Sequence, residues 1–241
     1  MKGVYNDILA AKKSNKKLLT ILIDPDKTSV HSTSSLINKV NQTKITHIFV
    51  GGSTVEEGII DGFISEIKKN TELPILIFPG NVTQISNKAD ALLFLSLISG
   101  RNPEYLIGKQ VEAVSKLKDT QLEVIPTGYL LIENGKETAV QRVSETKPML
   151  RKNVQLISDT AKAGELLGMK LIYLEAGSGA KHSINSEIIS KVKSKLKIPL
   201  IVGGGMRTLT QINNAYTGGA DMVVIGTAFE EDQSFLDELR K

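Results

Sequence analysis

Eight short apolar segments recur along the chain, and each of them ends in residues that favour turns. The segments are rich in β-branched residues and are too short and too continuously apolar for amphipathic helices, so we interpret all eight as buried strands. They cover residues 18–23, 47–50, 75–78, 91–97, 123–132, 171–174, 200–202 and 222–225. Segments of helical periodicity lie between them, at residues 34–42, 56–70, 103–117, 153–167, 185–196 and 209–218. The chain therefore alternates strand with helix.

This alternation strongly constrains the fold of the 241 residues. Eight buried strands joined by crossover helices are typical of a (β/α)8 barrel of the TIM type, which is an α/β fold. No linker rich in Pro, Gly or Ser divides the chain, so we expect a single domain over residues 1–241. Residues 81–90 are few and polar for a crossover helix, which predicts a degenerate third βα unit. A doubly wound open sheet is the alternative, because a strand count does not establish closure.

The composition argues against several classes of function. The chain has no Cys, which excludes disulfides and thiolate-bound metals. Its formal net charge is +4, but the cations are scattered among acids, so we expect no nucleic-acid partner. No apolar run approaches the roughly 20 residues of a membrane span, and no export signal is visible, so we expect a cytoplasmic protein. The three histidines lack metal-ligand spacing and no G-x-S-x-G motif occurs, which argues against zinc and triad chemistry.

In a barrel of this kind the active site is built from the loops that follow the strands. The seventh predicted strand is followed by Gly203, Gly204 and Gly205, and the eighth by Gly226 and Thr227. Glycine lets the backbone approach a ligand closely, and N–H groups at the start of a helix favour phosphate. Glycines at two consecutive strand ends therefore predict a phosphate-binding cup, with simple turn formation as the alternative.

The loop after the sixth predicted strand adds polar side chains to this cup. Strand alternation puts Tyr173 and Glu175 on one face and Leu174 on the other. A phenol and a carboxylate beside a phosphate cup can hold the hydroxyls of a small polyol phosphate, and Glu175 is the candidate general base. A structural ion pair with a barrel lysine is the alternative for Glu175. Ser178 and Gly179 would extend the cup.

Two oxygen ligands follow the first and second predicted strands. Asp24 and Ser53 are too few for a Ca2+ cage but suit Mg2+, which keeps waters and takes its other ligands from substrate phosphates. We therefore expect a site for Mg2+ and a diphosphate here. For Asp24, an Asx turn or helix cap before Pro25 is the alternative. Lys27 and Arg101 also follow strands, where they could contact a diphosphate or be ordinary surface charges.

Several strand-end motifs together resemble the geranylgeranylglyceryl phosphate synthase family over residues 20–230. This family includes archaeal ether-lipid enzymes and bacterial relatives, among them heptaprenylglyceryl phosphate synthases. The run Tyr-Leu-Glu-Ala-Gly-Ser-Gly at residues 173–179 is the most specific motif, and residues 99–108 are similar to the stretch after the family's fourth strand. The other motifs are Asp-Pro-Asp at 24–26, Gly-Gly-Ser at 51–53, Pro-Thr-Gly-Tyr at 126–129, Gly-Gly-Gly at 203–205 and Gly-Thr at 226–227.

The resemblance implies a prenyltransferase that joins the 3-hydroxyl of sn-glycerol 1-phosphate to a long polyprenyl diphosphate, with geranylgeranyl diphosphate expected. An ether forms and diphosphate leaves, with Mg2+ as cofactor, in the biosynthesis of ether lipids. Carried over by position, Asp24 and Ser53 would bind Mg2+, and Tyr173 and Glu175 would be the catalytic pair. Glycerol 1-phosphate would be bound by Tyr173, Leu174, Glu175, Ala176, Gly177, Ser178, Gly179, Gly204, Gly205, Gly226 and Thr227. Some bacterial relatives carry Lys where this chain has Leu22, so that phosphate contact is not assigned here.

The prenyl tail needs an apolar groove, and the candidates to line it are Tyr105, Leu106 and Tyr129, with residues 93–98. Exposed apolar surface beside the groove could meet a membrane peripherally or another subunit, and the resemblance implies a homo-oligomer. Two other functions compete with this interpretation. Another phosphate-binding barrel enzyme, such as an isomerase of a phosphorylated sugar-like amine, would need neither Mg2+ nor the groove. A non-catalytic lipid- or polyphosphate-binding protein would not need Glu175 as a base.

Overall fold

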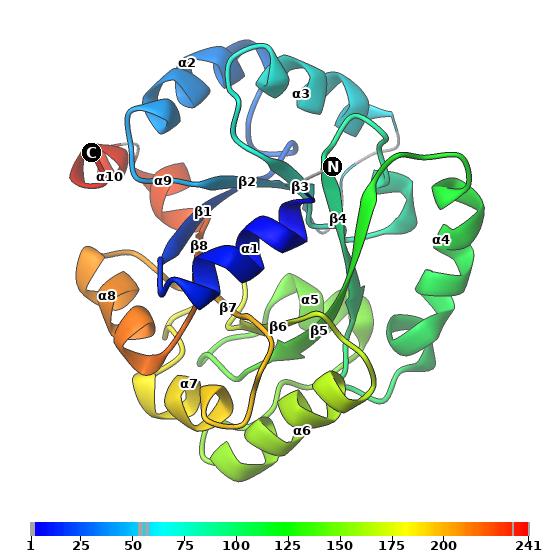
Figure 1. Cartoon of the computed structure of the whole chain (residues 1–241), viewed down its shortest axis with the longest axis vertical. Coiled ribbons are helices and arrows are strands. Elements are labelled where there is room, and N and C mark those ends of the chain that lie inside the picture. The colour runs from blue at the N-terminus through cyan, green and yellow to red at the C-terminus, as the bar shows by residue number, and fades with distance from the viewer. Residues whose placement is uncertain (1–2, 53–54, 56–57, 233, 241) are drawn as a thin grey trace.

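The computed structural model describes residues 3–52, 55, 58–232 and 234–240. Its eight parallel strands form a closed barrel in chain order, as Figure 1 shows. They are β1 (Leu18–Ile23), β2 (His47–Val50), β3 (Ile75–Ile77), β4 (Ala91–Ser96), β5 (Glu123–Leu131), β6 (Leu171–Glu175), β7 (Leu200–Gly203) and β8 (Met222–Ile225). The register of β1 against β8 runs from Leu18 beside Met222 to Ile21 beside Ile225. The predicted (β/α)8 barrel is confirmed, and the open-sheet alternative is wrong because these two strands pair.

Helices surround the barrel and connect its strands (Figure 1). They are α1 (Val4–Lys13), α2 (Val30–Asn41), α3 (Ile59–Lys68), η1 (Val82–Gln84), η2 (Glu104–Gly108), α4 (Lys109–Leu117), α5 (Ala139–Ser144), α6 (Val154–Leu166), α7 (Ser186–Lys193), α8 (Leu209–Gly218), α9 (Thr227–Glu231) and α10 (Phe235–Glu238). The bounds of α8 agree with the predicted residues 209–218. Thr208 and Gln211 form a capping box at its start, and Gly219 ends it with a φ of 110°.

The connection between β3 and β4 is the irregular one. Residues 78–90 are all described and contain η1 in place of a crossover α-helix. The side chain of Asn81 caps this short turn by accepting a hydrogen bond from the Val82 N–H at 2.7 Å. The prediction of a degenerate third βα unit is confirmed. Because no helix stands here, the loops after β2 and β3 come into direct contact.

The first helix closes one end of the barrel. Strand alternation divides the apolar side chains into a set that faces the outer helices and a set that fills the barrel. Val4, Ile8 and Ala11 of α1 pack on the second set, beside Leu18 and Met222, which begin their strands. Figure 1 shows α1 lying across the centre of the ring. The opposite end, at the carboxyl ends of the strands, is therefore the one available to a ligand.

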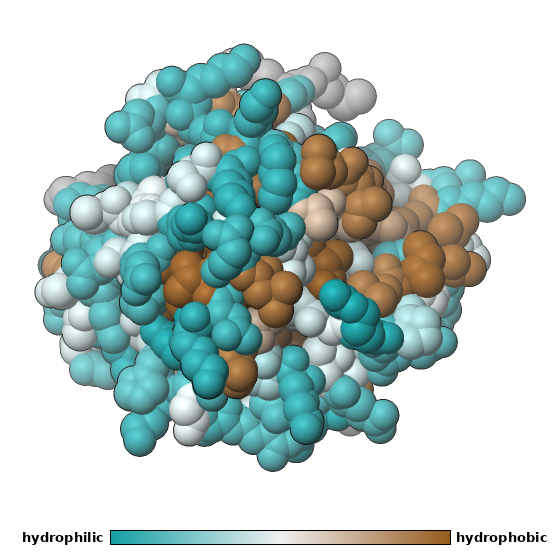
Figure 2. Space-filling view, turned by 90° about the horizontal axis from the view of Figure 1, so that it is seen from below, coloured by the Kyte–Doolittle hydropathy of each residue, from teal (hydrophilic) through white to brown (hydrophobic). Residues whose placement is uncertain are grey.

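Part of the outer surface is apolar. Ile107, Val111 and Val114 are each more than half exposed on η2 and α4, and Leu166 and Leu167 are exposed at the end of α6. On the face in Figure 2, apolar residues gather mainly toward the right of the view, while hydrophilic residues cover much of the rest. Within the described residues, no helix is both long and apolar enough to traverse a bilayer. The expected homo-oligomer and the expected peripheral membrane contact both stay predictions.

Candidate active site

A large cavity opens at the carboxyl ends of the strands. Together with its open mouth it has an empty volume of about 1580 Å³. Its wall includes the ends of β1 and β4, the loops after β2, β3, β6, β7 and β8, and side chains of α4 and α5. The lining is mixed, because backbone and polar groups face one part of the space and leucines face another. The cavity is therefore suited to a ligand with a polar and an apolar portion.

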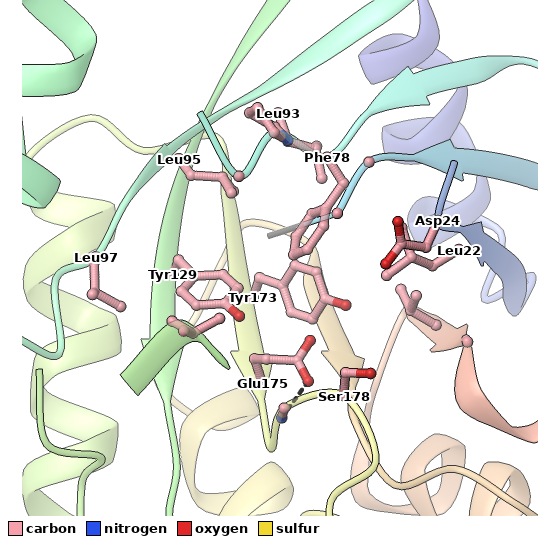
Figure 3. A pocket seen from close by; sticks show the side chains of 18 of the residues that line it. Leu22, Asp24, Phe78, Leu93, Leu95, Leu97, Tyr129, Tyr173, Glu175 and Ser178 are labelled. Atoms are coloured by element: carbon pink, nitrogen blue, oxygen red, sulfur yellow. Dashed lines mark hydrogen bonds between the residues drawn. The ribbon is translucent and has the colours of Figure 1, made fainter. Parts of the chain in front are cut away.

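Tyr173 and Glu175 point into this cavity from β6. Tyr173 packs among the residues that fill the barrel, while Leu174 packs in the layer between strands and helices, so the predicted alternation is confirmed. Phe78 and Tyr129 surround the Tyr173 ring, with ring centroids 5.3 Å and 5.5 Å from it. Figure 3 shows these rings in the middle of the pocket, with the Glu175 carboxylate directly beside them. An apolar aromatic wall thus meets a single carboxylate.

Burial controls the protonation of Glu175. The residue is 6% exposed, and burial raises the pKa of its carboxyl from 4.5 to about 7. The Gly177 N–H and the Tyr173 hydroxyl beside the carboxylate offset part of this rise. No described Lys or Arg forms an ion pair with Glu175, so the alternative of a structural pair is not favoured. A carboxyl with a pKa near neutrality is suited to accepting a proton.

Tyr173 stays protonated beside this carboxyl. Burial, and then the charge of Glu175, raises the pKa of the Tyr173 phenol well above its ordinary value of 10. Its hydroxyl is buried and has no hydrogen-bond partner of ordinary geometry within the described residues. A buried, unpaired hydroxyl at a cavity wall costs free energy unless a ligand or water satisfies it. The Tyr173 hydroxyl therefore has unused hydrogen-bonding capacity at the cavity wall.

Glycines bring the loops after β6, β7 and β8 together. Gly177, Gly179, Gly204 and Gly205 all have positive φ. At Gly204, where φ is 84°, a Cβ atom would lie 2.4 Å from Oε1 of Glu175, so the close approach itself requires glycine. The Thr227 hydroxyl accepts a hydrogen bond from the Gly179 N–H at 3.0 Å, which ties the loop after β6 to the loop after β8. The predicted cup is thus assembled in space.

Most of the predicted glycerol phosphate residues lie at the cavity. The ones that line it are Tyr173, Glu175, Gly177, Ser178, Gly204, Gly205, Gly226 and Thr227. Leu174 and Ala176 do not, because their side chains face the outer helices as members of the larger apolar core. Gly179 supports the wall through Thr227 without lining it. The sequence predicts a shared binding role for all of residues 173–179, but alternation along β6 gives these residues different surroundings.

Asp24 lies across the rings from Leu95 and Leu97, as Figure 3 shows. Its side chain is 16% exposed, and its carboxylate accepts a hydrogen bond from the Asp26 N–H at 3.1 Å. The Lys27 ammonium lies 3.8 Å from the same carboxylate. The Asx-turn alternative is therefore present in the geometry, although Asp24 and Lys27 also line the cavity. Ser53, the second expected metal ligand, lies outside the described residues.

One open alternative and one prediction concern residues outside the cavity. Arg101 is exposed, and its guanidinium donates to the carbonyl of Gly100, so it does not line the cavity and the surface-charge alternative is favoured. Leu106 does not line it either, because its carbonyl accepts a hydrogen bond from Ser96 and its side chain lies outside the lining. Tyr105 and Tyr129 do line the cavity, as expected for the groove.

The cavity also contains residues that the sequence did not point to. Arg207 lines it two positions after Gly205, and its guanidinium donates to the Ala180 carbonyl at 2.7 Å. Phe78, at the end of β3, supplies one of the central rings. A cation two positions after a glycine run is a sequence signal that could identify Arg207. No comparable signal marks Phe78, because an aromatic residue that ends a buried strand is usually part of the core.

Comparisons with known proteins agree with this geometry. Residues 11–241 match the PcrB family. A Flavobacterium johnsoniae protein named geranylgeranylglyceryl phosphate synthase is 58% identical over 97% of this chain and 96% of its own length. A Pyrococcus horikoshii protein of the same name is 41% identical over 99% of this chain and 93% of its own length.

A solved structure extends the similarity to three dimensions. It is the crystal structure of (S)-3-O-geranylgeranylglyceryl phosphate synthase from Thermoplasma acidophilum in complex with substrate sn-glycerol-1-phosphate. Its TM-score with this chain is 0.93 at 34% identity, covering 99% of this chain and 96% of that one. The resemblance inferred from the strand-end motifs is confirmed, and the chain belongs to the PcrB family.

Proposed function

We propose that this chain is a geranylgeranylglyceryl phosphate synthase, an enzyme that transfers a long prenyl group from its diphosphate to the 3-hydroxyl of sn-glycerol 1-phosphate. One observation carries the proposal. Glu175 is buried between a glycine-lined cup and an apolar wall within one cavity. The reaction joins an anionic polyol to a hydrocarbon, so it needs both surroundings and a proton acceptor where they meet. The matching names of the Flavobacterium and Pyrococcus relatives support the same activity.

The glycerol phosphate would occupy the part of the cavity built by the loops after β6, β7 and β8. Backbone N–H groups of Gly204 and Gly205 are suited to phosphate oxygens, and Arg207 adds a positive charge to this wall. Tyr173 and Glu175 would hold the glycerol hydroxyls from β6. The Thermoplasma acidophilum structure contains sn-glycerol-1-phosphate, which supports this compound as the substrate.

The prenyl tail would lie along the apolar part of the cavity. Leu93, Leu95 and Leu97 face this part from β4 and the residue that follows it, and Ala113 of α4 and Val143 of α5 also line it. In Figure 3, Leu95 and Leu97 lie on the side of the rings opposite Asp24, and Leu93 lies above Phe78. A tail on the leucine side would place the diphosphate near Asp24 and the reactive carbon beside the rings and Glu175.

Asp24 and Ser53 are the residues that would hold Mg2+. Within the described residues, no group of three or more His, Cys, Asp or Glu side chains could form a complete metal cage. A single carboxylate facing a cavity fits Mg2+, which takes few protein ligands and completes its shell with waters and phosphate oxygens. When bound, the ion would neutralise charge on the departing diphosphate. The donor set is therefore consistent with the expected cofactor.

The reaction balances with the groups that this chain supplies. The bond between the prenyl C1 and the diphosphate oxygen breaks, and the glycerol 3-oxygen forms an ether bond to C1. The hydroxyl proton passes to Glu175, and diphosphate leaves with both electrons of the broken bond. Positive charge that develops at the allylic carbon would face the Phe78 and Tyr129 rings, whose π-faces favour cations. Helix α1 closes the opposite end of the barrel, so water would reach this carbon only through the mouth of the cavity.

Product analysis tests the proposal directly. Purified protein is incubated with either enantiomer of glycerol phosphate and prenyl diphosphates from C10 to C35, with Mg2+ or with EDTA, and lipid extracts are analysed by mass spectrometry. We expect prenylglyceryl phosphate from sn-glycerol 1-phosphate only, with the largest yield from the C20 donor and none in EDTA. Absence of product with every donor would overturn the synthase and favour a binding protein. Turnover of glycerol-like phosphates without a prenyl donor would favour a different barrel enzyme.

A further inference from the structure

Gln84 is a buried polar residue that the reaction described above does not use. It ends η1, the short turn that replaces a crossover helix, and its side chain has no exposed surface. It does not line the cavity, although Val82 and Ile85 on either side of it do. A fully buried amide requires hydrogen bonds for its oxygen and its nitrogen, so its partners show what it holds in place.

Among the described residues, the hydrogen-bond partners of the Gln84 amide lie in two loops at the active-site end of the barrel. Its Nε2 donates to the Gly52 carbonyl at 2.7 Å, after β2. Its Oε1 accepts from the Gly80 N–H at 3.1 Å, after β3, and from the Gly52 N–H at 3.4 Å. The side chain thus links the backbones of the two loops through its own hydrogen bonds, beyond the ends of the paired strands β2 and β3. Both Gly52 and Gly80 line the cavity.

Gly52 in turn lies directly against Asp24. A Cβ atom on Gly52 would lie 2.3 Å from Oδ1 of Asp24, so backbone and carboxylate are in contact with no room between them. Gly51 has the same relation to the next loop, where its Cβ atom would lie 1.9 Å from the Phe78 carbonyl. A shift of the Gly52 backbone would therefore move the Asp24 carboxylate or open a gap beside it.

We propose that Gln84 is the positioning residue for the diphosphate-binding half of the site, where it clamps the loops after β2 and β3 and holds Gly52 against Asp24. This inference rests on the proposed function, because that function assigns the diphosphate to Asp24. The short turn η1 of the degenerate third βα unit is the element that places this amide between the two loops. Gln84 acts through Gly52 and does not touch the substrate.

The test compares Gln84→Met with a matched control. Methionine has a similar volume and removes every hydrogen bond of the amide. Thr43→Val is the control, because Thr43 is also buried and its hydroxyl makes two hydrogen bonds to backbone, in the loop that enters β2 at the opposite end of the strand. Calorimetry measures binding of inorganic diphosphate with Mg2+, in the presence of saturating sn-glycerol 1-phosphate, and separately binding of sn-glycerol 1-phosphate alone.

For Gln84→Met we expect diphosphate binding to weaken by about tenfold or more, with sn-glycerol 1-phosphate binding within about twofold of wild type. Thr43→Val loses thermal stability with both affinities unchanged. Equal weakening of both ligands in Gln84→Met, or no change in either, would overturn the positioning role. Where Gln84→Met does not fold, Gln84→Glu, which keeps the acceptor for Gly80 and loses the donor to Gly52, is judged by the same comparison.

The outcome separates this inference from the proposed function. Suppose that the wild-type protein forms no prenylglyceryl phosphate, but that Gln84→Met selectively loses diphosphate binding. This result would support the positioning role and refute the synthase proposal. Suppose instead that the wild-type protein forms product, but that Gln84→Met binds both ligands normally. This result would support the synthase proposal and refute the positioning role. If the wild-type protein binds no diphosphate, the positioning role is refuted, because the site then has no diphosphate-binding half for Gln84 to position.

Discussion

The loops after β6 and β7 border the same cavity as β4 and α4, but the two regions are built from different material. In the loops, glycines bring the backbone itself to the cavity, as Gly204 does beside Glu175. Along β4 and α4, the wall consists of side chains such as Leu93 and Ala113. A backbone wall leaves no room for change, whereas a side-chain wall changes shape with each substitution.

This difference separates two kinds of recognition. A phosphate and two hydroxyls require donors and acceptors at fixed positions, which a backbone held by positive-φ glycines supplies. A hydrocarbon tail requires only volume and apolar surface. We therefore expect substitutions in the glycine loops to abolish function and substitutions along the apolar wall to alter which substrate is used. The five predictions below test this contrast.

Gly204→Ala is expected to have the largest effect. The new methyl group would collide with Glu175 in a backbone conformation that L-residues avoid, so we expect a loss of more than about 3 kcal/mol in the free energy of unfolding. Gly168→Ala is the control, because Gly168 has a φ of 96° but nothing lies within 4 Å of its Cβ position. It should cost only about 1 kcal/mol, for conformational strain alone. Chemical denaturation measures both, and equal losses would mean that the close packing at Gly204 is unimportant.

Glu175→Gln should lower kcat by about 10²- to 10⁴-fold while leaving sn-glycerol 1-phosphate binding nearly intact. Gln keeps the shape and the acceptor for the Gly177 N–H but cannot take the substrate proton. In the wild type, kcat should rise with pH and level off above about 7, where the carboxyl is ionised. Steady-state kinetics between pH 5 and 9 measure this. A profile with no inflection near 7, or a variant with wild-type turnover, would remove Glu175 as the base.

The same substitution has a consequence for stability that does not depend on turnover. Because the folded-state pKa of Glu175 is raised from 4.5 to about 7, the folded protein binds this proton more tightly than the unfolded chain. The free energy of unfolding therefore falls as pH rises from about 4.5 to about 7. Above pH 7 it is roughly 3 kcal/mol lower than at low pH, as far as this group is concerned. Glu175→Gln should be more stable than wild type at pH 8, with the difference vanishing near pH 4. Denaturation at the two pH values checks the sign.

The sequence predicted the regular strands of the barrel well but missed a short helix and the long-range contacts of Gln84. β1 and β8 have the predicted bounds because each is a continuous apolar run next to turn residues. The six-residue α5 was missed because so short a segment shows no helical period. Gln84 was missed because its partners lie 32 and 4 positions away and nothing in its own segment marks them. The site roles of Glu175 and Asp24 stay predictions that the experiments above address.

Ala113→Phe addresses the side-chain wall and should have a moderate effect. Ala113 is buried at the cavity on α4, so a ring there would occupy space that we assign to the tail. We expect kcat/KM for the C20 donor to fall by about tenfold relative to a C10 donor, with sn-glycerol 1-phosphate binding unchanged. Val111→Phe, on the exposed face of the same helix, is the control and should leave both donors unaffected. A C20 to C10 ratio equal to that of wild type would place the tail elsewhere.

Leu22→Lys should have the smallest effect, because Leu22 lies on β1 beside Asp24 and belongs to neither of the two regions. Leu22 lines the cavity between Asp24 and Gly226, and its Cβ lies 3.8 Å from the Cβ position of Gly226. An ammonium group there would attract diphosphate but would also pair with the Asp24 carboxylate, so the two contributions partly cancel. The control is Leu22→Met, which is uncharged and has a similar volume. In EDTA, we expect inorganic diphosphate to bind the Leu22→Lys variant about threefold more tightly than it binds the Leu22→Met variant. With Mg2+ the gain should disappear, since the ammonium and the metal would compete for Asp24. Calorimetry in both conditions decides, and an equal gain with and without Mg2+ would show that Asp24 takes no part in holding the ion.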